Sequence, residues 1–476
     1  MKSLNSNSAI LRVINLTLKN KLSRNILLSS LDRNVRDRVL RDISPQSPKN
    51  VRMYHYYGLR AMYMSFFKNY DKGYISPEVA GKVIRTLVEE VFLGKKEQKE
   101  SKENFKNKYG QDSTTFITIS PTKKCNLNCT GCYASSNATC TASLDWTLLD
   151  KIIEDLYNNM GMRFFVISGG EPLLYKSENK TILDLAHKWN DCFFLVYTNG
   201  TLINDDIASQ MASAGNITPA ISVEGFETET DKRRGEGVFR KIINAKNSLI
   251  KNGVPFGLSV TATKENIGLM LDDSFYEYYF DNFGATYMWV FQYMPIGREF
   301  STDLMITPVQ RVELFKQEMK ILIDKKHFIA DFWNSAILSN GCISCGKPHG
   351  YFYINWDGNI MPCVFVPHYL DNVKSLYSSG KKLSDALFSP LFVKGREWQS
   401  DYLGNNGKPA NLLTPCFYRD HYKNFAEIAK STGAKPENQA AEDALQSTEY
   451  YEAMLSFDDQ LKKIASPVWD EILKTN

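Results

Sequence analysis

The stretch TFITISPTKKCNLNCTGCY, residues 115–133, joins a short apolar run to three closely spaced cysteines. Cys125, Cys129 and Cys132 follow the spacing C-x3-C-x2-C. Three thiolates this close together can hold three corners of a cubane iron–sulfur cluster, which leaves the fourth iron without a protein ligand. Electron-transfer clusters use four cysteines, so the open iron indicates a catalytic cluster. The alternative is a zinc knuckle, which needs a fourth ligand, and Cys140 is the nearest candidate.

Short apolar runs alternate with amphipathic stretches between residues 113 and 335. This alternation predicts an α/β fold with a parallel sheet. Six units are fewer than the eight of a closed barrel, so we expect a partial (β/α)6 TIM-like barrel with its chemistry at the carboxyl ends of the strands. The apolar runs cover residues 115–120, 163–168, 192–198, 217–223, 255–261 and 286–293.

The rest of the chain divides by composition. Residues 1–112 contain no cysteine and are expected to form an N-terminal helical extension. Residues 336–425 carry four cysteines among Gly, Pro and aromatic residues, which predicts a small cysteine-rich domain after the barrel of residues 113–335. The polar segment 426–476 is expected to be a helical tail.

The bulk composition excludes several classes of protein. The net charge of +4 is too small to indicate a nucleic-acid partner. No apolar run reaches the roughly 18 residues of a membrane span, and no secretion signal is evident. The nine cysteines then fit a reducing compartment, where clustered cysteines bind metals. We expect a cytoplasmic protein that works under anaerobic conditions.

Three turn-like motifs end successive apolar runs. They are Ser168-Gly169-Gly170-Glu171-Pro172, Thr198-Asn199-Gly200 and Ser222-Val223-Glu224-Gly225. Each reads alone as an ordinary turn. Placed after the cysteine loop, they resemble the radical S-adenosylmethionine (radical SAM) superfamily over roughly residues 113–425. In that family a reduced [4Fe–4S] cluster cleaves S-adenosylmethionine, and the 5′-deoxyadenosyl radical abstracts hydrogen from a substrate.

The resemblance implies roles for particular residues. Cys125, Cys129 and Cys132 would hold the catalytic cluster. Glu171 or a neighbouring carbonyl would receive the ammonium of S-adenosylmethionine, and residues 293–298 would support its adenine. Arg233 and Arg234 could equally form a solvated basic turn, and Thr261 is a further ribose candidate. The expected cofactor-binding set is Tyr133, Gly169, Gly170, Glu171, Thr198, Asn199, Ser222, Glu224, Arg234 and Ser259.

A second cysteine group lies near an expected hairpin over residues 355–363, with Asp-Gly at its turn. This region resembles the SPASM domain and its shortened form, Twitch, which hold auxiliary clusters. Four cysteines suffice for one, so we expect one auxiliary [4Fe–4S] cluster. A structural zinc site is the competing interpretation. The expected ligands are Cys342, Cys345, Cys363 and Cys416.

The first 60 residues contain 12 Lys and Arg against 3 Asp and Glu. Residues 8–31 interleave these charges with aliphatic side chains, which is typical of a helix lying on an anionic membrane. A helix that caps the barrel is the alternative.

The hypothesis is a radical SAM enzyme of uncertain oxidoreductase or transferase type that activates a C–H bond of a peptide or cofactor precursor. A ferredoxin or flavodoxin type protein would supply its electrons. The alternatives are a lipid substrate at the membrane surface, or a non-catalytic iron–sulfur or zinc scaffold.

Overall fold

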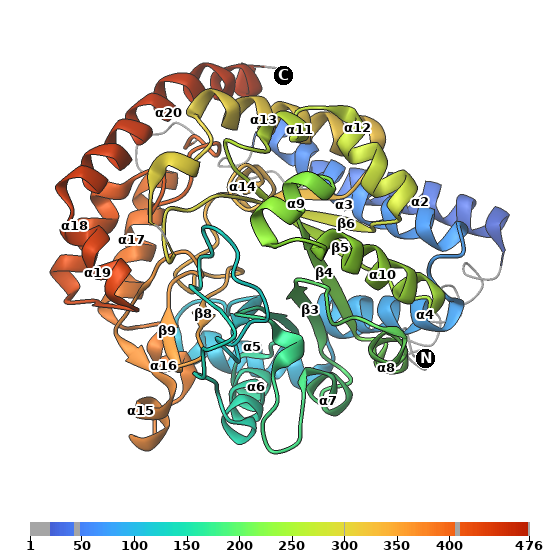
Figure 1. Ribbon diagram of the computed structural model, residues 1–476, viewed down its shortest axis with the longest axis horizontal. Coiled ribbons are helices and arrows are strands. Elements are labelled where there is room, and N and C mark those ends of the chain that lie inside the picture. Colours follow the sequence, from blue (N-terminus) through green and yellow to red (C-terminus); the bar gives the residue numbers. More distant parts are fainter. Residues whose placement is uncertain (1–19, 42–47, 299, 405–409, 475–476) are drawn as a thin grey trace.

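The computed structural model describes residues 20–41, 48–298, 300–404 and 410–474. Its centre is a ten-stranded sheet in the order β11-β9-β8-β1-β2-β3-β4-β5-β6-β7. Strands β1 to β6 pair in parallel, each with the next, which confirms the predicted partial barrel (Figure 1). Their bounds are β1 Phe116–Ile119, β2 Phe164–Ile167, β3 Phe193–Thr198, β4 Ile217–Val223, β5 Gly257–Ala262 and β6 Tyr287–Gln292.

Helices cover the outside of this sheet, as expected for parallel strands that are buried on both faces. Asp145 and Asn204 cap α6 and α8 by accepting the backbone N–H three residues ahead. These caps fix where each helix leaves its loop. The helices are α6 Trp146–Met160, α7 Ile182–Lys188, α8 Asp205–Ala214, α9 Glu227–Arg234, α10 Val238–Lys251, α11 Ile267–Met270, α12 Asp273–Tyr276 and α13 Pro308–Lys320, with 3₁₀ turns η2 Pro172–Leu174 and η4 Thr302–Leu304 and π-helical segments η3 Glu277–Phe283 and η5 Ile321–Lys325.

The sheet extends beyond the six predicted strands at both edges. A seventh parallel strand, β7 (Ile329–Asp331), pairs with β6. Its three residues lie among aromatic side chains and are too few to show the alternation of apolar and polar residues by which a strand is predicted. At the other edge the expected hairpin forms from β8 (Tyr353–Ile354) and β9 (Asn359–Met361), with Gly358 at positive φ in its turn. Because β8 pairs with β1, the sheet crosses the boundary expected at residue 335.

Helices before β1 form the predicted N-terminal extension, which lies behind the barrel in Figure 1. Of the segment 8–31, residues 8–19 lie outside the described residues. The remainder belongs mostly to α2, where Leu22 and Ile26 are exposed. The elements are α2 Lys21–Arg41, α3 Lys49–Asp71, α4 Pro77–Arg85, η1 Thr86–Leu93 and α5 Lys96–Tyr109.

The chain after the hairpin folds into helices that form an arc along one side of the barrel (Figure 1). The last of them, α20 (Thr448–Lys474), packs against α13 and so ties this arc to the barrel. The short helix α14 Ala336–Ser339 precedes the hairpin. The other elements after it are β10 His368–Tyr369, β11 Asp371–Asn372, α15 Val373–Ser378, α16 Leu383–Ala386, α17 Pro390–Gly404, α18 Tyr422–Thr432, β12 Lys435–Pro436 and α19 Gln439–Gln446.

Candidate active site

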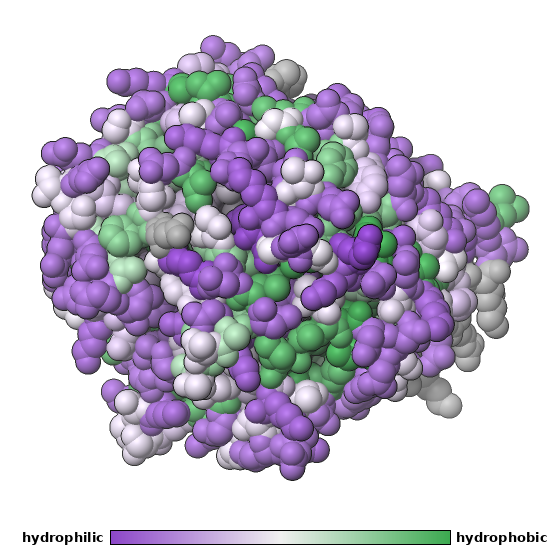
Figure 2. All heavy atoms as spheres, in the orientation of Figure 1, coloured by the Kyte–Doolittle hydropathy of each residue, from purple (hydrophilic) through white to green (hydrophobic). Residues whose placement is uncertain are grey.

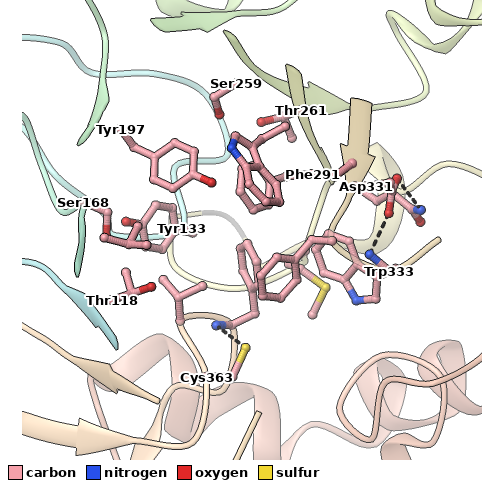
Figure 3. A pocket seen from close by; sticks show the side chains of 18 of the residues that line it. Thr118, Tyr133, Ser168, Tyr197, Ser259, Thr261, Phe291, Asp331, Trp333 and Cys363 are labelled. Atoms are coloured by element: carbon pink, nitrogen blue, oxygen red, sulfur yellow. Dashed lines mark hydrogen bonds between the residues drawn. The ribbon is translucent and has the colours of Figure 1, made fainter. Parts of the chain in front are cut away.

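A cavity of about 720 Å³ opens at the carboxyl ends of the strands and brings the two cysteine groups together. One wall contains the cysteine loop, and the opposite wall comes from the chain after β7. Figure 3 shows Tyr133, Ser168 and Tyr197 on one side of this space and Trp333 on the other, with Cys363 at the bottom of the view. The cysteines that line it are Cys125, Cys129, Cys132, Cys342, Cys363 and Cys416.

The GGEP segment packs directly on the cysteine loop. Gly170 and Glu171 donate their backbone N–H groups to the carbonyls of Thr122 and Lys124, at 2.9 and 2.8 Å. A Cβ atom at Gly170 would lie 2.2 Å from the Lys124 carbonyl oxygen. The glycine is therefore required for a close approach of two protein backbones, in addition to the approach to a ligand that the sequence suggested.

Glu171 lies behind the cavity wall and does not line the cavity. Its carboxylate is fully buried and accepts hydrogen bonds from Thr198 Oγ1 at 2.7 Å, the Asn199 backbone N–H at 2.8 Å and the Leu173 backbone N–H at 3.0 Å. Burial raises its pKa, although these hydrogen bonds act in the opposite direction. In this structure Glu171 joins the second strand end to the third through these hydrogen bonds.

The Thr-Asn-Gly turn reaches the cysteine loop through Asn199. Its Nδ2 donates to Asn126 Oδ1 at 2.9 Å and lies 3.9 Å from Cys125 Sγ. Both Thr198 and Asn199 line the cavity. This turn therefore fixes the orientation of the first cysteine.

Arg233 and Arg234 are partly buried rather than solvated, because both pair with Glu224. Glu224 is 1% exposed and does not line the cavity, whereas both arginines do. Burial by itself would lower the pKa of Arg234, but Glu224 raises it above the usual value. The two guanidinium groups therefore face the cavity, and the Glu224 carboxylate lies behind them.

Hydroxyl groups from successive strand ends line the wall between the two cysteine groups. Tyr133 and Ser168 lie side by side in Figure 3, and Ser168 Oγ is 3.0 Å from Ser120 Oγ. Ser222, Ser259 and Thr261 line the same cavity, and their contact with a cofactor stays a prediction. These groups are suited to hydrogen bonds with the ribose and carboxylate of a nucleoside cofactor.

Arg298 has a structural role that the sequence did not reveal. Its backbone N–H donates to the Cys132 carbonyl at 3.0 Å, and its guanidinium donates to the carbonyls of Cys129 at 2.8 Å and Ser136 at 2.5 Å. The preceding Gly297 has φ of +73°, and a Cβ there would meet the Tyr133 carbonyl at 2.2 Å. The segment expected to support adenine therefore holds the cysteine loop in shape.

The second cysteine group is gathered by polar contacts. Ser344 Oγ lies 3.2 Å from Cys342 Sγ and 3.4 Å from Cys345 Sγ, and Tyr351 Oη lies 2.8 Å from Cys363 Sγ. The Cys416 backbone N–H donates to Asp420 at 3.0 Å. Three segments therefore bring these cysteines into one region, and Cys342, Cys363 and Cys416 line the cavity.

Both cysteine groups supply thiol donors, the ligand type that iron–sulfur clusters use. Burial raises the pKa of the Cys125, Cys345 and Cys363 thiols to about 12. Such thiols stay protonated unless a metal replaces the proton. Within the described ranges, no three His, Cys, Asp or Glu side chains converge on a single ion.

The remainder of the cavity is mostly apolar and aromatic. Its floor comes from the N-terminal extension, where Gly58 and Met62 of α3 reach it. Figure 2 shows a patch of hydrophobic residues near the centre of the face onto which the barrel opens. Two polar residues interrupt the wall at the ends of β6 and β7, where Gln292 Nε2 donates to Asp331 Oδ2 at 2.9 Å. The aromatic lining includes Phe116, Phe164, Trp289, Phe291, Phe332 and Phe365.

Comparisons with known proteins agree with this site. The Radical SAM superfamily profile matches residues 119–271. The chain is 29% identical over 309 residues to "Mycofactocin maturase MftC" of Mycobacterium ulcerans, covering 61% of this chain and 79% of that protein. It is 31% identical over 150 residues to "AdoMet-dependent heme synthase" of Methanosarcina barkeri, covering 31% and 42%.

Among solved structures, Streptococcus suis SuiB bound to S-adenosylmethionine matches with a TM-score of 0.51 and 16% identity, covering 67% of this chain and 76% of that one. At this identity the likeness concerns the fold alone. No described helix has the length and apolar character of a membrane span.

The barrel and the cysteine loop define an iron–sulfur enzyme that uses a nucleoside cofactor. Residues 119–271 match the Radical SAM superfamily model, so this part of the chain is a radical SAM domain. Its cofactors are S-adenosylmethionine and the [4Fe–4S] cluster, which would be held by Cys125, Cys129 and Cys132 and would supply the electron for reductive cleavage.

Proposed function

We propose that this enzyme modifies a peptide by activating one of its C–H bonds, with an auxiliary iron–sulfur cluster at Cys342, Cys345, Cys363 and Cys416. The observation that carries the proposal is the shared cavity, because Cys125, Cys129 and Cys132 line it together with three cysteines of the second group. A substrate held there lies between the residues for S-adenosylmethionine and the second cysteine group. An electron released from the substrate would then have a short path to an acceptor.

The relatives support a peptide substrate. MftC is named as a maturase of mycofactocin, "Sporulation killing factor maturation protein SkfB" of Bacillus subtilis is 25% identical over 150 residues, and SuiB has been solved with its precursor peptide SuiA. The aromatic wall of the cavity favours an uncharged, bulky side chain at the reacting position. A cofactor precursor remains the second candidate, because the matched heme synthase is named for a product of that kind.

Residues at the strand ends would bind different groups of S-adenosylmethionine. The hydroxyls of Ser222, Ser259 and Thr261 are placed for ribose, and Arg234 offers a cation to the cofactor carboxylate. Glu171 and Glu224 act from behind the wall by positioning the Thr-Asn-Gly turn and the two arginines. A small ferredoxin or flavodoxin type protein is proposed as the electron donor.

The first test is reductive cleavage of S-adenosylmethionine. Anaerobically reconstituted, dithionite-reduced protein should produce 5′-deoxyadenosine, and a Cys125→Ala variant should not. Equal product from both proteins would contradict the assignment of the catalytic cluster. Iron and sulfide should come to about eight of each per chain, as two [4Fe–4S] clusters require. About four irons with one zinc would contradict the auxiliary cluster.

The peptide can then be sought without knowing its sequence. Peptide fractions from deuterated cells should transfer deuterium to 5′-deoxyadenosine, whereas lipid and small-molecule fractions should not. Transfer only from a lipid fraction would overturn the peptide proposal in favour of a membrane substrate.

A further inference from the structure

Arg419 carries a buried positive charge three residues after Cys416. Its side chain is fully buried, between the rings of Trp333 and Phe457, whose centroids lie 5.3 and 5.1 Å from the guanidinium carbon. None of its three guanidinium nitrogens has a hydrogen-bond partner among the described residues. A buried charge without such partners is costly unless another charge balances it.

The nearby carboxylates already have partners. Arg311 forms a bidentate pair with Asp420, and its Nη2 lies 3.0 Å from Asp420 Oδ2. Asp331 accepts hydrogen bonds from Gln292 and from the backbone N–H groups of Trp333 and Asn334. Two arginines thus lie in this region, and only Arg311 has a bonded counter-ion among the described residues.

The loop of Arg419 turns back onto the second cysteine group. The Arg419 backbone N–H donates to Cys416 Sγ at 3.4 Å. Trp333, under the guanidinium, lines the cavity together with Cys363 and Cys416 (Figure 3). A [4Fe–4S] cluster with four thiolate ligands is anionic, and its negative charge grows by one unit on reduction. Such a cluster is the counter-ion that Arg419 lacks, and nearby charge is one of the factors that set its potential.

We propose that Arg419 is the buried counter-cation of the auxiliary cluster and raises its reduction potential. This inference rests on the proposed auxiliary cluster. The cation stabilises the reduced cluster more than the oxidised one, because the reduced form carries the larger negative charge. Arg419 is therefore a positioning and tuning residue that favours electron transfer from the substrate to the cluster.

The experiment is a dithionite titration of the reconstituted full chain, monitored by electron paramagnetic resonance, with iron counted in parallel. Arg419→Met should make the auxiliary cluster at least tenfold harder to reduce, which is about 59 mV for a one-electron couple. Arg419→Lys should retain most of the wild-type potential. The catalytic cluster should be unchanged in both. The matched control is Arg163→Met, because Arg163 is also buried against an aromatic ring but lies at the opposite end of β2.

Each outcome bears on the inference. Selective loss of about four irons in Arg419→Met, with full iron in Arg419→Lys and Arg163→Met, would also support it, since the charge is then needed to hold the cluster. An unchanged potential in Arg419→Met, or equal iron loss in all three variants, would overturn it. If the wild type itself holds only one cluster, the proposed auxiliary cluster is contradicted. Iron analysis of the wild type alone shows this, so the two failures can be told apart.

Discussion

At the scale of single residues, most polar side chains of the site hold other protein groups. Arg298 is the clearest case, since its guanidinium and backbone N–H bind three carbonyls of the cysteine loop and its turn. Hydrogen bonds from a charged donor each contribute roughly 1.5–3 kcal/mol. The geometry of the three thiols therefore depends on a residue about 170 positions away in the chain.

Arg298→Ala should lower 5′-deoxyadenosine formation by about tenfold and the free energy of unfolding by about 2 kcal/mol, because the loop carbonyls lose their charged donor. Steady-state cleavage assays and urea unfolding under anaerobic conditions measure the two effects. Arg240→Ala, on the exposed face of α10, is the control and should change neither. Wild-type activity in Arg298→Ala would contradict the assigned role.

Two buried histidines make the protein sensitive to acid. Burial lowers the pKa of His327 and of His368 to about 4. The folded state therefore binds fewer protons than the unfolded state, and stability falls as the pH drops from about 6.5 towards 4. By this linkage each histidine costs about 2 kcal/mol at pH 5.

His368→Phe should remove the contribution of His368 to this acid sensitivity, because phenylalanine does not bind a proton. The site suits an apolar ring, since the His368 ring lies 5.3 Å from Phe425 and neither ring nitrogen has a described hydrogen-bond partner. Compared with the wild type, its free energy of unfolding should drop less between pH 7.5 and pH 5. His187→Phe, at an exposed position, serves as control. Parallel pH dependence in His368→Phe and the wild type would count against this account.

At the scale of elements, the ends of β1 to β4 act as one unit because their turns interlock. Gly170 is the tightest point, because two carbonyl oxygens of the cysteine loop lie within 2.5 Å of the place that a Cβ atom would occupy. Neither oxygen can move without displacing the loop that carries Cys125.

Gly170→Ala should therefore reduce iron at the catalytic site and lower S-adenosylmethionine cleavage by more than tenfold. Overpacking of this kind typically costs about 1–3 kcal/mol. Gly268→Ala is a matched control, since a Cβ there meets nothing within 4 Å. Iron analysis and the 5′-deoxyadenosine assay compare the two, and equal behaviour would show that the loop tolerates displacement.

Membrane contact through residues 8–31 stays a prediction. Leu22 and Ile26 of α2 are exposed at 70% and 65%, among basic residues. The full chain should float with anionic liposomes and a Leu22→Glu, Ile26→Glu variant should float less. Absence of the wild type from the liposome fraction would remove this contact.

At the scale of the whole molecule, the second cysteine group faces the first because the hairpin β8–β9 extends the barrel sheet next to β1. Cys363 follows that hairpin, and α13 holds the Cys416 loop through Arg311. The auxiliary site is thus built onto the barrel at two places.

Cys363→Ala should reduce iron from about eight to about four per chain while 5′-deoxyadenosine formation continues without peptide product. The reason is that the catalytic cysteines lie on the other wall of the cavity. Iron analysis and mass spectrometry of the peptide test this. Retention of both iron and product would contradict the proposed role of the second cysteine group.

Sequence alone determined the fold class and placed three cysteines on one loop, because both are local signals. Strand and helix periods repeat every few residues, and C-x3-C-x2-C places three thiols on one loop whatever surrounds it. The six predicted strands are confirmed for the same reason. The short strand β7 was missed because three residues carry no period.

Tertiary structure alone decided which polar residues face the cavity and which lie behind it. Glu171 and Glu224 occupy motif positions, yet they bind neighbouring turns. Arg298 was expected only as part of a segment that supports adenine, and it holds the cysteine loop. Such roles depend on contacts between distant segments, which no local pattern encodes. That the Arg419 guanidinium has no hydrogen-bond partner among the described residues became visible only in the tertiary structure.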